Sequence, residues 1–491
     1  MRYRVVIALA GGLLASCMMG PDYHRPVVET PQRFLYAPQE AAATADTEWW
    51  KQFDDPVLNE SIAAALANNK DVKIAAANVE QAAAVLIQTR SPLFPQVGYQ
   101  GTAARVRLSQ NSTTAVPGGI SNPTDAYSLL AGASWELDLW GRVRRLSEAA
   151  RANLLASEEA RRGVILSLAA QVATTYIQLR GLDEQLAVSQ RTLATYGESL
   201  RITNDKFKFG QVSKMNVAQV QSQYETAAAK IPQIRSQIVL TENALSVLLG
   251  RNPGSVPRGK SILTLTLPPV PAGVPSELLE RRPDLLQAEQ QLVTANAQIG
   301  AAKALYFPTI SLTGALGTSS TQLHELFTGP SRVWAFAGQL SGPIFTGGAV
   351  SGQVAQATAG QKVALASYER AIQNAFADVE DTLSTREQLV EQLAAQERLV
   401  KALQEYSALA RLQYDGGYSP YATVLQAEQQ LFPEELNLAA VRAQLFASLV
   451  SIYRAMGGGW VNEADKLAPQ PVAESGFLAP SLPSATTPQP K

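Results

Sequence analysis

Cysteine and histidine are almost absent from this chain of 491 residues, which has one cysteine, Cys17, and two histidines, His24 and His324. A single cysteine excludes a disulfide within the chain, and three such side chains leave almost no room for a zinc cluster of cysteine and histidine ligands. Neither histidine is accompanied by a nucleophile elbow, so a Ser-His-Asp triad is disfavoured. We therefore expect neither an enzyme nor a bound metal or other cofactor.

Net charge is also nearly absent, because 41 basic residues are balanced by 42 acidic ones. This balance does not indicate a basic surface for nucleic acid. With 491 residues, the chain is too long for one ordinary hydrophobic core. More than one structural unit is therefore expected.

Long hydrophobic runs are missing, apart from a short one near the N-terminus. Arg2 and Arg4 precede an apolar run over residues 5–14, which is too short to span a membrane and is typical of a secretory signal. No other apolar run approaches 18 residues, so no membrane-spanning helix is expected in the mature chain. Any crossing of a membrane then has to use a β-barrel.

The residues "ASC" at 15–17 resemble the cleavage box of bacterial lipoproteins. The resemblance implies a signal peptide at 1–16 and a covalent lipid on Cys17, the first mature residue. Met18 stands where an aspartate favours inner-membrane retention in enterobacterial lipoproteins, which points to the outer membrane. An ordinary signal peptide with an incidental cysteine is the alternative. The lipidated segment 17–54 is expected to be extended at its start, where prolines recur.

The chain contains one pattern twice, at a spacing of 207 residues. "FGQVSKMNVAQVQSQ" begins at Phe209 and matches "GGYSPYATVLQAEQQ", which begins at Gly416. "SPLFPQVGYQG" near residue 91 is likewise echoed by "ALYFPTISLTG" near residue 304. This predicts two repeats at 55–250 and 275–457, joined by a linker at 251–274 and followed by a flexible tail at 458–491.

Each repeat is predicted to hold a helix, two strands, a very long helix, a turn and a second long helix. The very long helices are expected at about 141–207 and 347–414, and at about 1.5 Å per residue each reaches roughly 100 Å. In the second long helices, apolar residues recur every seven positions, which predicts coiled-coil packing. In the second repeat this stripe consists of Val424, Leu431, Leu438, Leu445 and Ile452.

The predicted strands alternate between apolar and polar residues. Over residues 127–139, one face is apolar and the other carries Glu136 and Asp138. Alternation over this length is typical of a barrel strand between lipid and water, so both carboxylates are predicted to be lumen acids. The other strands are expected at 96–108, 309–316 and 334–344. A soluble β-sandwich is the alternative.

Four strands cannot close a membrane barrel, because about eight is the smallest number known. An open sheet edge in lipid would leave backbone groups without hydrogen bonds. Several chains must therefore share one barrel, and two chains or three would supply eight or twelve strands. Because a long helix follows every pair of strands, the barrel must be wide enough for all of these helices to fit around it. This favours three chains over two.

Four longer motifs resemble the TolC/OprM family of outer-membrane efflux channels, in its lipoprotein (NodT-type) branch. They are "GPDYHRP" from residue 20, "WWKQFDDPVLNE" from 49, "DLWGRVRR" from 138 and "LLERRPDLLQAEQQLVTANAQIGAAKALYFPTISLTG" from 278. The resemblance covers nearly the whole mature chain. It implies a mixed membrane fold, in which a homotrimer forms a twelve-stranded β-barrel in the outer membrane and a long α-helical coiled-coil tunnel in the periplasm.

The resemblance also implies partners and a role. The expected partners are a periplasmic adaptor (a membrane fusion protein) and a proton-driven inner-membrane pump of the RND type. The chain would be the passive exit duct for drugs or other small molecules. A duct for protein secretion is the second choice within this architecture, and a lipid-anchored coiled-coil scaffold without a pore is the alternative from another class.

By this resemblance, the repeated signature is the hairpin farthest from the outer membrane. Gly210 and Gly417 suit the left-handed residue that ends a helix. Ser213 and Ser419 are predicted to cap the helices that follow. Three copies of both hairpins would converge there and close the tunnel, with Gln219 among the gate candidates of the first hairpin.

Acidic residues that the family often carries at this point are missing. When the motifs are matched, Thr423 and Gln426 stand where the family has two ring-forming acids. Asn216 stands where it has an acid in the first repeat. A gate tyrosine matches Tyr414, but its arginine companion falls on Ser419. We therefore expect a weakly ion-selective pore that is held shut by packing and neutral hydrogen bonds, one of them between the Tyr414 hydroxyl and the Asn216 amide.

Overall fold

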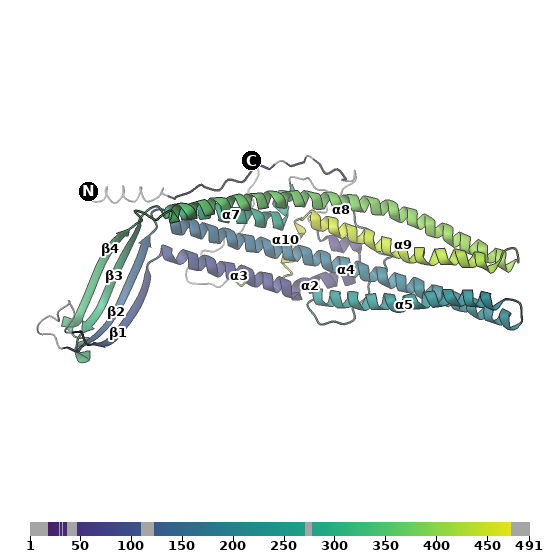
Figure 1. Cartoon of the computed structure of the whole chain (residues 1–491), viewed down its shortest axis with the longest axis horizontal. Helices are drawn as coiled ribbons and strands as arrows, with labels where there is room; N and C mark the ends of the chain where they lie inside the picture. The colour runs from purple at the N-terminus through teal and green to yellow at the C-terminus, as the bar shows by residue number, and fades with distance from the viewer. Residues whose placement is uncertain are drawn as a thin grey trace.

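The structure is a computed structural model and describes residues 18–28, 30–31, 33–36, 47–109, 122–270 and 277–472. The predicted signal peptide 1–16 and Cys17 lie outside these residues. Figure 1 shows an elongated molecule with a β-sheet at one end and two helical hairpins at the other. Long helices connect the two ends.

Both repeats have the predicted order of elements, except that two helices rather than one precede each pair of strands. The first contains α2 (Pro56–Asn68), α3 (Lys70–Arg90), β1 (Gln96–Val106), β2 (Thr124–Leu137), α4 (Arg142–Lys208) and α5 (Lys214–Leu248). The second contains α6 (Leu278–Arg281), α7 (Pro283–Ala304), β3 (Thr309–Ser320), β4 (Arg332–Ser341), α8 (Ala349–Asp415) and α9 (Tyr421–Ala455). The first and last residues of α8 and α9 lie 207 residues after those of α4 and α5.

The strands differ from the predicted ones at their ends. β3 continues to Ser320 rather than residue 316, because its serines and threonine still pair with β2 through backbone groups. β4 ends at Ser341 rather than residue 344, since Pro343 has no N–H to donate to a ladder. β1 likewise ends at Val106 instead of residue 108.

The four strands form one antiparallel sheet in the order β1-β2-β3-β4. Ala131 of β2 lies opposite both Tyr99 and Leu316, and Leu316 lies opposite Trp334. Residues opposite one another share a face. Tyr99, Leu316 and Trp334 are 88%, 65% and 72% exposed, so this face of the sheet is apolar and uncovered within the described residues.

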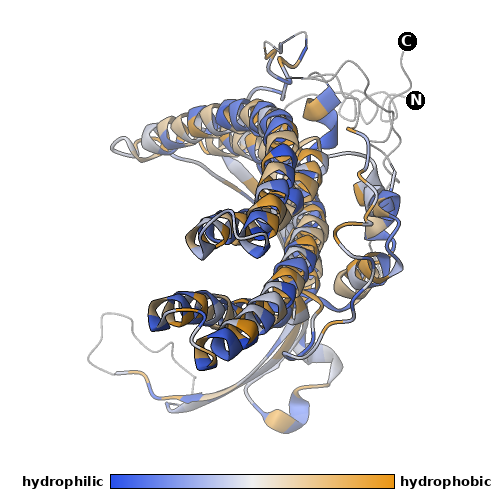
Figure 2. Cartoon of the chain, turned by 90° about the vertical axis from the view of Figure 1, so that its right-hand side faces the viewer, coloured by the Kyte–Doolittle hydropathy of each residue, from blue (hydrophilic) through white to orange (hydrophobic). Residues whose placement is uncertain are grey.

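The long helices pack side by side in a curved wall, seen along the molecule in Figure 2. In the half near the sheet, the wall runs α3, α4, α7, α8. In the other half, α4 and α5 form a first hairpin, α8 and α9 form a second hairpin, and α4 contacts α9 between them. By length and composition, α9 could cross a membrane, but 61% of its most apolar window is buried, as in a core helix.

An aromatic cluster fills the middle of the molecule. Trp49 stacks on Tyr453 with ring centroids 5.4 Å apart and meets Trp460 edge-on at 5.9 Å. Trp460 begins a short helix, α10 (Trp460–Asp465), and is fully buried. The predicted flexible tail is therefore wrong for 458–472, which a buried tryptophan anchors, whereas 473–491 lie outside the described residues.

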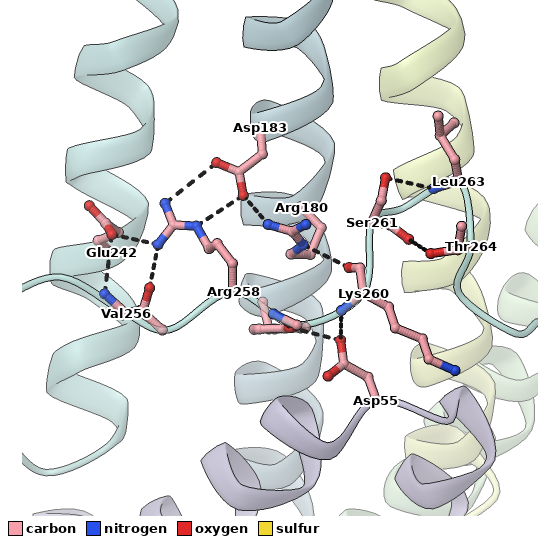
Figure 3. A network of polar contacts seen from close by, with 12 residues as sticks. Asp55, Arg180, Asp183, Glu242, Val256, Arg258, Lys260, Ser261, Leu263 and Thr264 are labelled. Atoms are coloured by element: carbon pink, nitrogen blue, oxygen red, sulfur yellow. Dashed lines mark hydrogen bonds and ion pairs between the residues drawn. The ribbon is translucent and has the colours of Figure 1, made fainter.

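The linker between the repeats is fastened to three helices by polar contacts (Figure 3). The guanidinium of Arg258 lies 3.0 Å from the Asp183 carboxylate of α4 and 2.6 Å from the Glu242 carboxylate of α5. Asp55, fully buried before the start of α2, accepts a hydrogen bond from the backbone N–H of Lys260 at 3.0 Å. The linker thereby holds the base of the first hairpin against α2.

Candidate functional site

Glycines end the helices at both hairpin turns, as predicted. Gly210 has a φ of +67° and Gly417 a φ of +73°, in the left-handed region that favours glycine. The next residues donate backbone hydrogen bonds back across the turn, from Gln211 to Lys206 at 2.9 Å and from Tyr418 to Gln413 at 2.8 Å. The two turns therefore share one compact geometry.

The caps that follow the turns are not equivalent. The Ser213 hydroxyl accepts a hydrogen bond from the Asn216 N–H at 3.3 Å and caps α5, as predicted. The predicted Ser419 cap is wrong, because α9 begins at Tyr421 after an extended Pro420, and the buried Ser419 hydroxyl has no partner among the described residues. At the spacing of 207 residues, Ser213 corresponds to Pro420 rather than to Ser419.

Tyr414 is held by its ring rather than by its hydroxyl. The predicted hydrogen bond to Asn216 does not form within the chain, because the Asn216 side chain accepts from the Ser213 hydroxyl at 2.8 Å. The Tyr414 ring meets Tyr421 edge-on at 5.1 Å, and the Lys206 ammonium lies 5.1 Å from its centroid. An edge-on aromatic pair and a cation–π contact thus link the end of α8 to both neighbours.

The other gate candidates are neutral and partly accessible. Thr423 is half-buried on α9, and Gln426 is exposed one turn later. Gln219 is half-buried on α5. Their arrangement in a ring needs further copies of the chain, so their role in a gate stays a prediction.

An ion pair that the sequence did not reveal lies within the second hairpin, and hydrogen bonds around it reach α4 of the first hairpin. Arg411 of α8 donates to the Ser199 hydroxyl of α4 at 3.0 Å and to the Glu428 carboxylate of α9 at 2.9 Å. The Tyr196 hydroxyl of α4 donates to the backbone carbonyl of Glu428 at 3.2 Å. Because 17 residues and a turn separate Arg411 from Glu428, no helical spacing signals this contact.

Glu428 is buried where the hairpins meet. The residue is 5% exposed, and its second carboxylate oxygen has no hydrogen-bond partner among the described residues. Burial raises the pKa of Glu428, whereas Arg411 acts in the opposite direction. The gate candidates at the tip are therefore neutral, but one buried carboxylate lies further inside.

The two predicted lumen acids lie where β2 passes into α4. Asp138 accepts hydrogen bonds from the N–H groups of Val143 and Arg144 at 3.0 and 2.9 Å, so it caps the first turn of α4. Glu136 is bound on both oxygens by Arg142 at 3.0 Å. Asp138 lies beyond the end of β2 and is committed to this cap, and Glu136 is compensated by a cation.

The described N-terminal segment is fastened at the same junction. The N–H of Met19 donates to the carbonyl of Trp140 at 3.1 Å. Arg145, whose side chain is 2% exposed, donates to the Met19 carbonyl at 3.0 Å and to Asp22 at 2.8 Å. A Cβ on Gly141 would lie 2.7 Å from Met18. The residue that follows Cys17 is thus held between the sheet and the helices.

Known proteins share this arrangement over nearly their whole length. The model of the family described as outer membrane efflux protein matches residues 61–251 and 274–458. The toluene efflux pump outer membrane protein TtgC of Pseudomonas putida is 36% identical over 96% of this chain and 98% of its own. The cation efflux system protein CusC of Escherichia coli O6:H1 is 34% identical over 92% of this chain and 97% of its own.

Solved structures agree with this relationship. The open state of the Neisseria gonorrhoeae MtrE outer membrane channel superposes with a TM-score of 0.82 and 33% identity, over 90% of this chain and 99% of that one. The predicted fold class, four barrel strands in a duplicated chain continued by a long helical coiled coil, is therefore confirmed, as is the predicted location in the outer membrane. The chain belongs to the outer membrane efflux protein family.

Proposed function

We propose that this protein is the passive outer-membrane duct of a three-part efflux system. An inner-membrane proton-driven pump of the RND type would expel drugs or other small molecules through a periplasmic adaptor and this duct. The duct itself would have no catalytic role and no cofactor besides its covalent lipid. The observation that carries the proposal is a sheet whose apolar face no described residue covers, and which continues into helices of 67 residues. Such a sheet would face lipid, and such helices would form a tunnel in the periplasm.

The assembly that fits this sheet is a homotrimer. β1 and β4 are the edge strands, and in lipid their outer backbone groups need partners. Pairing β4 of one copy with β1 of the next closes a barrel without edges, and three copies give the twelve strands that leave a lumen. The same closure sets α8 of one copy beside α3 of the next, which continues the helical wall.

The converging hairpin tips are the proposed gate. In the closed tunnel, the neutral side chains of Asn216, Gln219, Thr423 and Gln426 would approach their counterparts in the other copies. Packing around Tyr414 would hold the second hairpin in place. The adaptor and the pump would open the duct by drawing the hairpins apart.

The lipid on Cys17 is the proposed anchor. The segment after it is fastened beside Trp140, at the base of the sheet, which supports insertion of acyl chains into the same membrane as the barrel. Several acyl chains on one residue would hold far more firmly than a single myristoyl chain. A Cys17→Ser variant should therefore fail to incorporate labelled palmitate.

The decisive test is conductance of the purified full-length protein in planar lipid bilayers. Stepwise single-channel currents, together with heat-modifiable migration of a trimer on gels, are expected from a pore. A trimer that never conducts would instead support the coiled-coil scaffold. A conducting trimer that restores export of a protein substrate but not drug resistance, in cells lacking their own duct, would support the secretion duct.

A further inference from the structure

Glu428 is a buried carboxylate at a largely apolar interface between the two hairpins. Clusters of buried apolar side chains lie on either side of it along α9. The cluster on the side of the sheet contains Val188, Tyr196, Ala227, Phe432 and Leu436, and the cluster on the side of the turn contains Val220, Ala410, Tyr421, Val424 and Ala427. Separation of the hairpins would expose this carboxylate to water.

The groups around Glu428 do not fully compensate its charge. Arg411 of α8 binds one carboxylate oxygen, but its own side chain is 43% exposed and is shared with Ser199. The ionisable groups that face it besides Arg411 are the phenols of Tyr196 on α4 and Tyr421 on α9. On α5, the neutral Gln223 donates to the backbone carbonyl of Leu425, three residues before Glu428 on α9. The second carboxylate oxygen has no partner in the described part of the chain.

The first repeat lacks this arrangement. At the spacing of 207 residues, Glu428 corresponds to Gln221 and Arg411 to Asn204. Gln221 is exposed. Duplication therefore does not explain the buried ion pair, which is confined to the second hairpin.

We propose that Glu428 makes closure of the tunnel tip depend on protons, so that protonation of its carboxylate tightens the contact between the hairpins and ionisation favours their separation. The inference rests on the proposed function, because it takes separation of the hairpins as opening of the duct. Its physical basis is that a neutral carboxyl group is far less costly to bury than a charged one.

The direction of the pH effect follows from the burial. In the closed arrangement, burial raises the pKa of Glu428 above the ordinary value of 4.5, and this outweighs Arg411. When the hairpins separate, the hydrated carboxylate regains its ordinary pKa. The closed arrangement thus binds the proton more tightly, so closure is favoured as pH falls through the raised pKa and weakened above it. Each unit of pKa difference changes the ratio of closed to open forms by up to about tenfold.

The test measures passive leak through the full-length trimer in planar bilayers from the ordinary pKa of 4.5 upwards to about pH 7.5. For the unaltered protein, leak should rise with pH, by up to about tenfold per unit of pKa difference. Glu428→Gln, which mimics the protonated group, should have low leak and lose this dependence. Arg411→Gln should move the midpoint to higher pH, because the one contact that favours ionisation is removed. Asp415→Asn, which removes an exposed carboxylate near the turn, should keep the unaltered profile.

Two results would overturn the proposal: a leak that does not change with pH in the unaltered protein, or a pH profile that Glu428→Gln leaves intact. If Glu428→Gln does not assemble, Glu428→Leu provides the same comparison with an apolar side chain, and heat-modifiable migration confirms the trimer. Absence of conductance at every pH would contradict the proposed pore itself, whereas a conducting but pH-insensitive trimer contradicts only the role of Glu428.

Discussion

Arg145 and Asp22 form an ion pair of 2.8 Å across a sequence separation of 123 residues. The same guanidinium donates to the carbonyl of Met19, and it is buried at the start of α4. One side chain therefore fastens the described N-terminal segment to the junction between the sheet and the tunnel helices. The attachment uses a backbone carbonyl as well as a side-chain carboxylate.

Arg145→Ala should release this segment. The partly buried carbonyl of Met19 would lose a charged donor, at a cost of about 1–3 kcal/mol. We expect a protease to cleave within residues 18–28 of the folded variant, and thermal unfolding to occur at lower temperature. Arg151→Ala, which removes an exposed arginine two turns along the same helix, is the matched control. Equal protease resistance of both variants would show that Arg145 does not hold the segment.

Tyr414→Phe should leave the passive leak nearly unchanged, although the hydrogen bond expected from the sequence would have made this variant leaky. The ring contacts with Tyr421 and Lys206 remain in phenylalanine. Tyr414→Ala removes them, at about 1–2 kcal/mol, and should raise the leak severalfold. Bilayer recordings at constant pH compare the two variants. A leaky Tyr414→Phe trimer would mean that the hydroxyl bonds to another copy of the chain.

The sequence predicted what depends on local pattern. The repeat spacing and the two glycines placed the ends of the long helices within two residues, because a left-handed residue stops a helix whatever surrounds it. It missed what depends on contacts between distant segments. Trp460 looked like the start of a loose tail, but its indole completes an aromatic cluster with Trp49. Arg411 and Glu428 carry no spacing signal, because a turn separates them.

Gly417→Ala should destabilise the closed tip without any steric clash. The φ of Gly417 is +73° and nothing lies within 4 Å of the position that a Cβ would take, so the cost is backbone strain alone, about 1–2 kcal/mol. Gly417→Asn should cost less, because asparagine tolerates this conformation better than alanine. Gly210, with a φ of +67° and equally open surroundings, allows the same comparison in the first hairpin. The leak should be largest for the alanine variant, smaller for the asparagine variant and smallest with glycine. A reversed order would contradict the strain argument.

The tip should show little selectivity between cations and anions, because Thr423, Gln426 and Asn216 are neutral. A ring of carboxylates at a constriction concentrates cations through its local field. Thr423→Asp would add three such charges to a trimer, and should move the reversal potential in a KCl gradient towards that of potassium. Thr423→Asn controls for the change of shape without charge.

Strong cation selectivity of the unaltered channel would contradict this prediction. The carboxylates that select cations would then lie outside the set of Thr423, Gln426 and Asn216. Asp415 near the turn and Glu136 in the sheet are then the carboxylates to neutralise. Glu136 is already bound by Arg142 on both oxygens, so Glu136→Gln should change the reversal potential less than Asp415→Asn does. Salt screens an exposed carboxylate strongly. The change in reversal potential caused by Asp415→Asn should therefore become smaller as ionic strength rises from about 0.1 M towards about 1 M. A contribution from pore shape would not depend on ionic strength in this way.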